Sequence, residues 1–157
     1  MSNRDRPRVR RYQQNYTTTI HFSKTLVEIQ ETLRLSGAKG IAVEYNDEML
    51  PIGIKFLAKS QYGLMQFQVP INPMKVLERM KKQNLPNRYL TKEHAYNVAW
   101  RMLKELIESQ MNYIQSEMID LQQMMFPFIT DGRTTIYERF KENKFEGMVM
   151  LNEGEKE

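Results

Sequence analysis

The chain has 157 residues, of which 41% are hydrophobic and 27% charged, and its formal net charge at pH 7 is +4. This length and balance are typical of one globular domain, and no apolar run approaches the ~18 residues that a membrane span needs. The absence of cysteine excludes disulfides, thiolate zinc sites and cysteine nucleophiles. The basic N-terminus has no apolar segment behind it, so we expect a cytoplasmic protein rather than a secreted one.

The two ends of the chain differ in charge from its middle. The last residues are mainly acidic, and the first eleven contain five arginines, namely Arg4, Arg6, Arg8, Arg10 and Arg11. Dense like charge and few apolar residues oppose folding of such segments. We therefore expect a disordered basic arm over residues 1–15, a single domain over 16–143 and a flexible acidic tail over 144–157.

The first half of the domain contains the patterns of strands. Alternating apolar and polar residues from Tyr16 to Phe22 predict a half-buried strand, and Ser23 is a candidate cap for a helix that ends at Ser36-Gly37. Three more strands follow, over Ile41–Tyr45, Ile52–Phe56 and Met65–Val69, separated by polar turns. The predicted order is β-α-β-β-β.

The second half contains the patterns of helices. Asn72-Pro73 starts a short helix that reaches Lys82, because proline suits the first helical position. Thr91 caps the longest helix, in which apolar residues recur at helical spacing as far as Ile114. A second apolar block covers 121–128, and Thr134 or Thr135 can start a last short helix after a turn.

Together these patterns predict an α+β fold. A small antiparallel sheet is packed with helices and is followed by a helical C-terminal half with one long helix. We expect Trp100 to anchor that helix to the sheet. We also expect Arg101, Lys104, Glu105 and Glu108 to pair along the helix at spacings of three and four.

No motif in the sequence fixes a reaction. His21 and His94 are too far apart in the chain to match a zinc-ligand spacing, and there is no glycine-rich phosphate loop or serine elbow. One hairpin holds the residue types of a metal-dependent nuclease but without its spacing, which favours a solvated turn: Glu44, Asp47, Glu48 and Lys55. We therefore expect no catalytic residue, no metal and no cofactor.

Nucleic-acid binding is better supported, because cations attract phosphates and aromatic rings stack on unpaired bases. A second basic segment with an aromatic residue surrounds the end of the short helix. The candidate binding residues, with single-stranded DNA as the expected ligand, are Arg4, Arg6, Arg8, Arg10, Arg11, Tyr12, Tyr16, Lys75, Arg79, Lys81, Lys82, Arg88 and Tyr89. The alternative is structural: Lys81 and Lys82 complement the negative end of their helix, and the arm is an idle terminus.

Protein partners are a second possibility. The sequence has twelve methionines, and five of them lie along the predicted C-terminal helices. Such a stripe is most often core, but flexible methionine also suits adaptable interfaces. Apolar patches at Met124–Phe128 or Met148–Leu151 could bind a bacterial host protein or a second copy of the chain.

Several segments resemble a family of small uncharacterised proteins carried by bacteriophages and other mobile elements. They are YTTTI, SKTLVEIQETLRLSGAKGIAVEY, FQVP, AYNVAWRMLKELIESQMNYIQSEMIDLQQMMFPFI and DGRTTIYE, and they span most of residues 16–140. The run from Ala99 to Gln110 is the most specific of them. The resemblance implies a viral accessory protein that acts in a bacterial cell on replicating DNA or on host defence. It does not extend to the arginines of residues 4–11.

Overall fold

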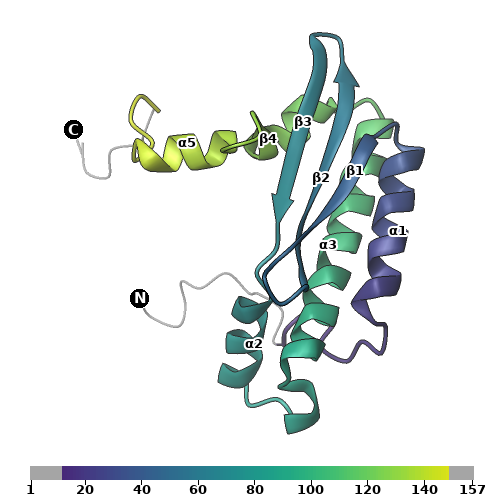
Figure 1. Cartoon of the computed structure of the whole chain (residues 1–157), viewed down its shortest axis with the longest axis vertical. Helices are drawn as coiled ribbons and strands as arrows, with labels where there is room; N and C mark the ends of the chain where they lie inside the picture. The colour runs from purple at the N-terminus through teal and green to yellow at the C-terminus, as the bar shows by residue number, and fades with distance from the viewer. Residues whose placement is uncertain (1–11, 149–157) are drawn as a thin grey trace, which may run out of the picture.

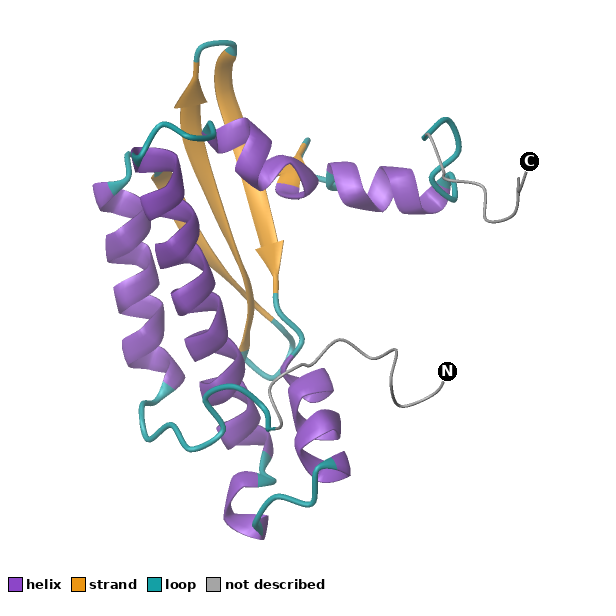
Figure 2. Ribbon diagram, turned by 180° about the vertical axis from the view of Figure 1, so that it is seen from behind, coloured by secondary structure: helices purple, strands orange, loops and turns teal. Residues whose placement is uncertain are grey.

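The computed structural model describes residues 12–148 and has two layers, a four-stranded antiparallel sheet and a pair of long helices that covers one face of it (Figures 1 and 2). The strands, in the spatial order β1-β2-β3-β4, are β1 Lys39–Tyr45, β2 Pro51–Ser60, β3 Gly63–Pro70 and β4 Ile129–Thr130. The α-helices are α1 Phe22–Leu35, α2 Pro73–Lys82, α3 Lys92–Gln115, α4 Leu121–Met125 and α5 Ile136–Glu142, and the 3-10 helices are η1 Asn87–Tyr89 and η2 Phe126–Phe128. The predicted α+β fold with one long helix is confirmed.

The core lies between the sheet and helices α1 and α3. Alternate residues of β2 and β3 point into it, and the stacked rings of Phe56 and Phe67, with centroids 5.1 Å apart, form its centre. From the helices, Ile29 and Trp100 are fully buried against this layer. Trp100 therefore anchors the long helix to the sheet, as predicted. Burial of such side chains is the main source of the fold's stability.

The predicted first strand is wrong. Residues 14–17 form a turn, in which Asn15 has a φ of 62° and the amide of Thr18 donates back to the carbonyl of Asn15. Residues 18–21 are not assigned to a strand. The alternation arises because Tyr16 and Phe22 pack on other aromatic rings, of Tyr89 and Tyr96, rather than on a sheet. The true order begins α-β-β-β.

Most element boundaries follow the sequence signals. Helix α2 covers Pro73–Lys82 as predicted, and the hydroxyl of Thr91 accepts a hydrogen bond from the amide of His94 at the start of α3. Thr135 caps α5, and its side chain and that of Glu138 each accept a hydrogen bond from the other residue's backbone. The sequence offered Thr134 or Thr135 as the start of this helix, and the structure shows that it is Thr135. The cap of α1 is His21 instead of the expected Ser23.

The C-terminal segment leaves the body of the molecule. After α3 the chain passes through α4 and η2, pairs two residues of β4 with β3, and then projects outwards as α5 (Figures 1 and 2). The strand β4 was not predicted. Phe145, in the predicted tail, packs on the rings of Tyr137 and Phe140. Over residues 12–148 no helix combines the length and the apolarity of a membrane span.

Candidate nucleic-acid interface

Gln13 fixes the point at which the chain enters the described domain. It is 3% exposed, and its amide donates to Oε1 of Gln83 over 2.8 Å. Its side-chain oxygen accepts from Nη1 of Arg79 over 3.1 Å, and its Nε2 donates to Sδ of Met102. Residues 12–15, predicted as the end of a disordered arm, are thus part of the packed domain. Arg4, Arg6, Arg8, Arg10 and Arg11 lie outside the described residues.

Three tyrosines and a histidine form a continuous aromatic cluster beside this entry point. The ring of Tyr16 lies between those of Tyr12 and Tyr89, with centroid distances of 5.9 and 5.4 Å, and Tyr89 also contacts the ring of His94 at 5.2 Å. Nε2 of His94 donates to the carbonyl oxygen of Tyr16 over 2.5 Å. Edge-to-face and tilted rings at these distances attract one another, so the cluster has a defined shape.

Arg88 completes the cluster on its solvent side. Its guanidinium lies 4.7 Å from the centre of the Tyr89 ring and donates to the hydroxyl of that residue over 3.0 Å. A guanidinium over an aromatic face keeps its charge available to solvent while its position is fixed. The combination of a cation in a fixed position with the exposed Tyr12 suits both phosphates and bases.

The remaining predicted cations have different roles. Lys75 pairs with Glu78 at 3.5 Å, and Arg79 is half-buried and holds Gln13. Lys81 and Lys82 are exposed in the last turn of α2, and among residues 12–148 neither they nor Arg88 make an ion pair. Three cations of this end are therefore not neutralised by a described carboxylate.

The structure thus brings together residues that are remote in sequence. Tyr12, Tyr16, Arg79, Arg88 and Tyr89 meet at one end of the molecule, where α2 and η1 lie beside the start of α3 (Figure 1). The sequence did not reveal the parts played by Gln13 and His94. Gln13 is the first of three consecutive polar residues between Tyr12 and Tyr16, and nothing in the sequence distinguishes it from the other two. The only signal for His94 was its position three residues after Thr91, the cap of α3.

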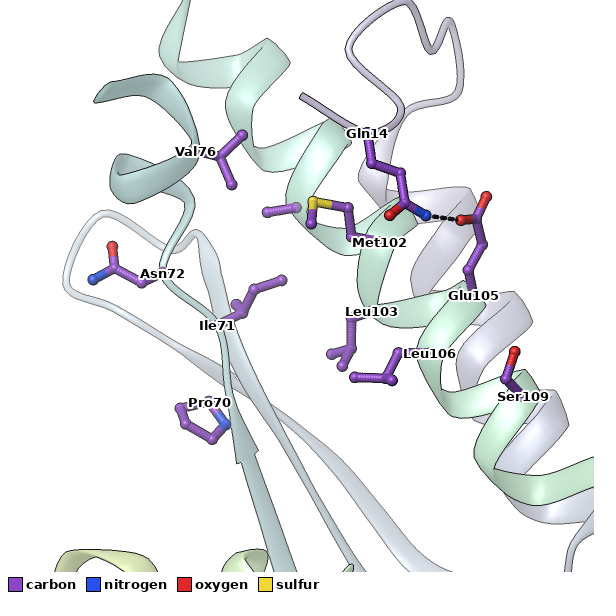
Figure 3. Close-up of a pocket in the computed structure, with 11 residues that line it drawn as sticks. Gln14, Pro70, Ile71, Asn72, Val76, Met102, Leu103, Glu105, Leu106 and Ser109 are labelled. Atoms are coloured by element: carbon purple, nitrogen blue, oxygen red, sulfur yellow. Dashed lines mark hydrogen bonds between the residues drawn. The ribbon is translucent and has the colours of Figure 1, made fainter. Parts of the chain in front are cut away.

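A mostly apolar pocket of about 560 Å³ adjoins this end (Figure 3). It opens between α2, α3 and the end of β3, and Val76, Ile71 and Leu106 are among its walls. At its rim the side-chain amide of Gln14 donates to the carboxylate of Glu105. The apolar lining distinguishes this pocket from the cationic surface beside it.

A separate network of charges joins α1 to α3. Arg101 donates to Glu28 over 2.7 Å, and Lys104 lies 3.5 Å from Glu28 and 2.7 Å from Glu108. Burial raises the pKa of Glu28, but the hydrogen bond from Arg101 and the charges of Arg101 and Lys104 outweigh it, and the pKa falls below its usual value. The expected pairing of Lys104 with Glu108 is confirmed, whereas Arg101 pairs across the helices and Glu105 turns to Gln14.

The charged side chains of the hairpin that has the residue types of a metal-dependent nuclease do not meet at one point. Glu44 pairs with Lys55 at 3.5 Å, Glu48 contacts Lys92, and Asp47 lies exposed in the turn. Across residues 12–148 no group of three or more histidine, aspartate or glutamate side chains is placed to hold a metal ion.

Comparison of the chain with models of protein families, with curated proteins and with solved structures found no match.

Proposed function

We propose that this protein binds single-stranded nucleic acid, with DNA as the expected ligand, at the end formed by α2, η1 and the entry of the chain. The observation that carries the proposal is the meeting of Tyr12, Tyr16, Tyr89 and Arg88 with the basic end of α2. Tyr12 directly follows the five arginines of residues 4–11 in the sequence, so a ligand at this surface would be within reach of the start of the arm. The resemblance to phage and mobile-element proteins supplies a matching context.

Each part of the surface would contribute a different interaction. The exposed lysines and Arg88 would neutralise phosphates and release counterions, which gives affinity that falls steeply with salt. Tyr12, whose side chain is 42% exposed, offers a face for stacking on an unpaired base. Stacking of this kind contributes about 1–3 kcal/mol per base and tolerates any sequence. The proposed binding is therefore sequence-independent and non-enzymatic.

The test is fluorescence anisotropy with labelled single- and double-stranded oligonucleotides at several salt concentrations. The triple variant Lys81→Gln, Lys82→Gln, Arg88→Gln should weaken binding at least tenfold. A matched control replaces three exposed cations that lie away from this end and make no ion pair among residues 12–148, namely Lys39→Gln, Lys59→Gln and Arg133→Gln. Equal losses for the two variants would mean that net charge, and not this surface, drives binding.

Deletion of residues 1–11 tests the arm separately. If all five arginines contact phosphates, the slope of log K against log salt should fall by about 3.5, because each contact with a single strand contributes ~0.7. An unchanged slope would show that the arm is idle. Absence of binding at low salt in the intact chain would reject the proposed function.

A second candidate is binding to a bacterial host protein, as an inhibitor or anti-defence factor. Phe126 favours it, because its ring is 50% exposed beside the exposed Pro127. Met148 is also exposed, while residues 149–151 of the second predicted patch lie outside the described chain. Affinity capture from bacterial lysate, with and without nuclease, separates the candidates. Recovery of one host protein in stoichiometric amount, both with and without nuclease, supports host-protein binding if the Phe126→Ser variant no longer recovers it.

A further inference from the structure

Helix α5 is short and has no buried residue. It spans seven residues, and its main contacts within the chain are with η2. Large apolar side chains on and around it stay open to solvent: Tyr137 is 49% exposed and Met148 is 46% exposed. Helices shorter than about 12 residues are marginal in water unless another surface covers their apolar side. Phe145 and η2 pack on part of this helix, but within residues 12–148 the side chains of Tyr137 and Met148 stay about half exposed.

Polar contacts nevertheless hold α5 in its outward position. Asp131 accepts hydrogen bonds from the amides of Arg133 and Thr134, and its second oxygen accepts from Arg139 on α5 over 2.6 Å. Thr130 and Thr135 form a bridge across the same turn. The helix therefore leaves the body in a set direction, away from the sheet (Figures 1 and 2), and does not fold back on α3.

An apolar groove on one side of α3 is not covered by any of residues 12–148. The pocket of about 560 Å³ and a second one of about 250 Å³ share Ser109, and the second reaches Tyr113 and Met124. Leu106 is 51% exposed and Tyr113 is 44% exposed along this line. From Met102 to Tyr113 the groove follows eleven helical steps, about 16 Å, whereas the seven residues of α5 extend about 10 Å. The groove is therefore long enough for the whole helix.

We propose that two copies of the chain form a dimer in which α5 of each copy lies in the α3 groove of the other. Each copy has one helix α5 and one groove. A dimer with two-fold symmetry therefore covers both helices and both grooves. Large apolar side chains that are half exposed offer about 100 Å² each. Five of them per copy, Leu106, Tyr113, Phe126, Tyr137 and Met148, give about 1,000 Å² over the pair, which is the smallest area expected of a specific interface.

Sedimentation of the full-length protein at several concentrations tests the dimer. Leu106→Glu alters the groove and Tyr137→Glu alters the helix, and each should weaken dimerisation at least tenfold. The control Val27→Glu places the same charge on α1, where the residue is 64% exposed, and should leave the dimer intact. Circular dichroism establishes that all three variants fold. A monomer at every concentration, or a dimer unaffected by both groove and helix variants, would overturn the proposal.

Cross-linking tests which surfaces meet. The chain has no cysteine, so Leu106→Cys and Tyr137→Cys introduce unique thiols. Mixing the two variants under mild oxidation should give a disulfide-linked dimer that contains one chain of each. Efficient cross-linking of Tyr137→Cys alone, without the mixed product, would show that the helices pack on each other and would overturn the exchange. Because the mixture contains no nucleic acid, the outcome does not depend on whether the protein binds nucleic acid.

Discussion

The indole Nε1 of Trp100 donates a hydrogen bond to the backbone oxygen of Pro51 over 3.1 Å, and both residues are fully buried. The contact joins the middle of α3 to the first residue of β2. It satisfies the only polar atom of the largest core side chain, and it gives a carbonyl at the start of a strand a partner away from water.

Replacement of Trp100 by phenylalanine should therefore destabilise the protein. The smaller ring leaves a cavity and leaves the Pro51 oxygen without its donor, which together cost about 2–4 kcal/mol. Urea denaturation followed by circular dichroism measures the change. Tyr62→Phe, at a ring that is 78% exposed, is the control and should stay within about 0.5 kcal/mol of the parent chain. A loss below 1 kcal/mol for Trp100→Phe would contradict the anchoring role.

Asp131 should make stability depend on pH in the acid range. Hydrogen bonds from the amides of Thr134 and Arg133, followed by the charge of Arg139, lower the pKa of its carboxyl from 3.8 to about 2. A pKa that is lower in the folded state means that the stabilisation is complete above about pH 4 and is lost as the pH falls towards 2. Asp131→Asn should flatten the unfolding free energy over that window.

The control for this experiment is Asp47→Asn. Asp47 is exposed in the turn after β1, and no described residue bonds to its side chain. Chemical denaturation between pH 2 and 5 should give parallel curves for the control and the parent chain. If Asp131→Asn kept the same acid dependence as the parent, the ionised carboxyl would not be what fixes the turn before α5.

Local signals in the sequence predicted most of the fold. The proline at 73 and the cap at Thr91 placed the starts of α2 and α3 to the residue, because these signals act on the backbone of the helix end itself. The period-two pattern identified β1, β2 and β3. The same pattern failed at Tyr16–Phe22, since alternation records which side chains are buried and not what buries them. The two residues of β4 are too few for any period.

The candidate site was only partly predictable. Charge and aromatic content identified Arg88 and Tyr89, because such composition is visible without a fold. The contacts that bring Tyr16 to Tyr89 and Gln13 to Arg79 span 73 and 66 residues, respectively, and depend on how η1 and α2 pack beside α3. Long-range packing of this kind has no local sequence signal.

Glu28 should contribute to stability through its partners on α3. Arg101 and Lys104 are only 19% and 15% exposed, so Glu28→Gln leaves two partly buried cations without their shared carboxylate, at a cost of about 1–3 kcal/mol at pH 7. The pKa of Glu28 is lowered in the folded state, so its contribution is lost as the pH falls below the ordinary value of 4.5. The gap between variant and parent should narrow on acidification. Glu31→Gln, at an exposed pair within α1, is the control and should change stability much less than Glu28→Gln.

Gln13 links the stability of the domain to the proposed interface. Gln13→Ala removes the acceptor of Arg79 and the donor to Met102, and a half-buried guanidinium without its partner costs about 1–3 kcal/mol. The neighbouring Tyr12 and Tyr16 would also lose their fixed position, so the affinity for single-stranded oligonucleotides should fall several-fold. Thr17→Ala, at an exposed residue of the same turn, is the control for both measurements. If Gln13→Ala lowers the unfolding free energy but leaves the affinity unchanged, the aromatic cluster is a structural brace and the ligand is held by the lysines and arginines alone.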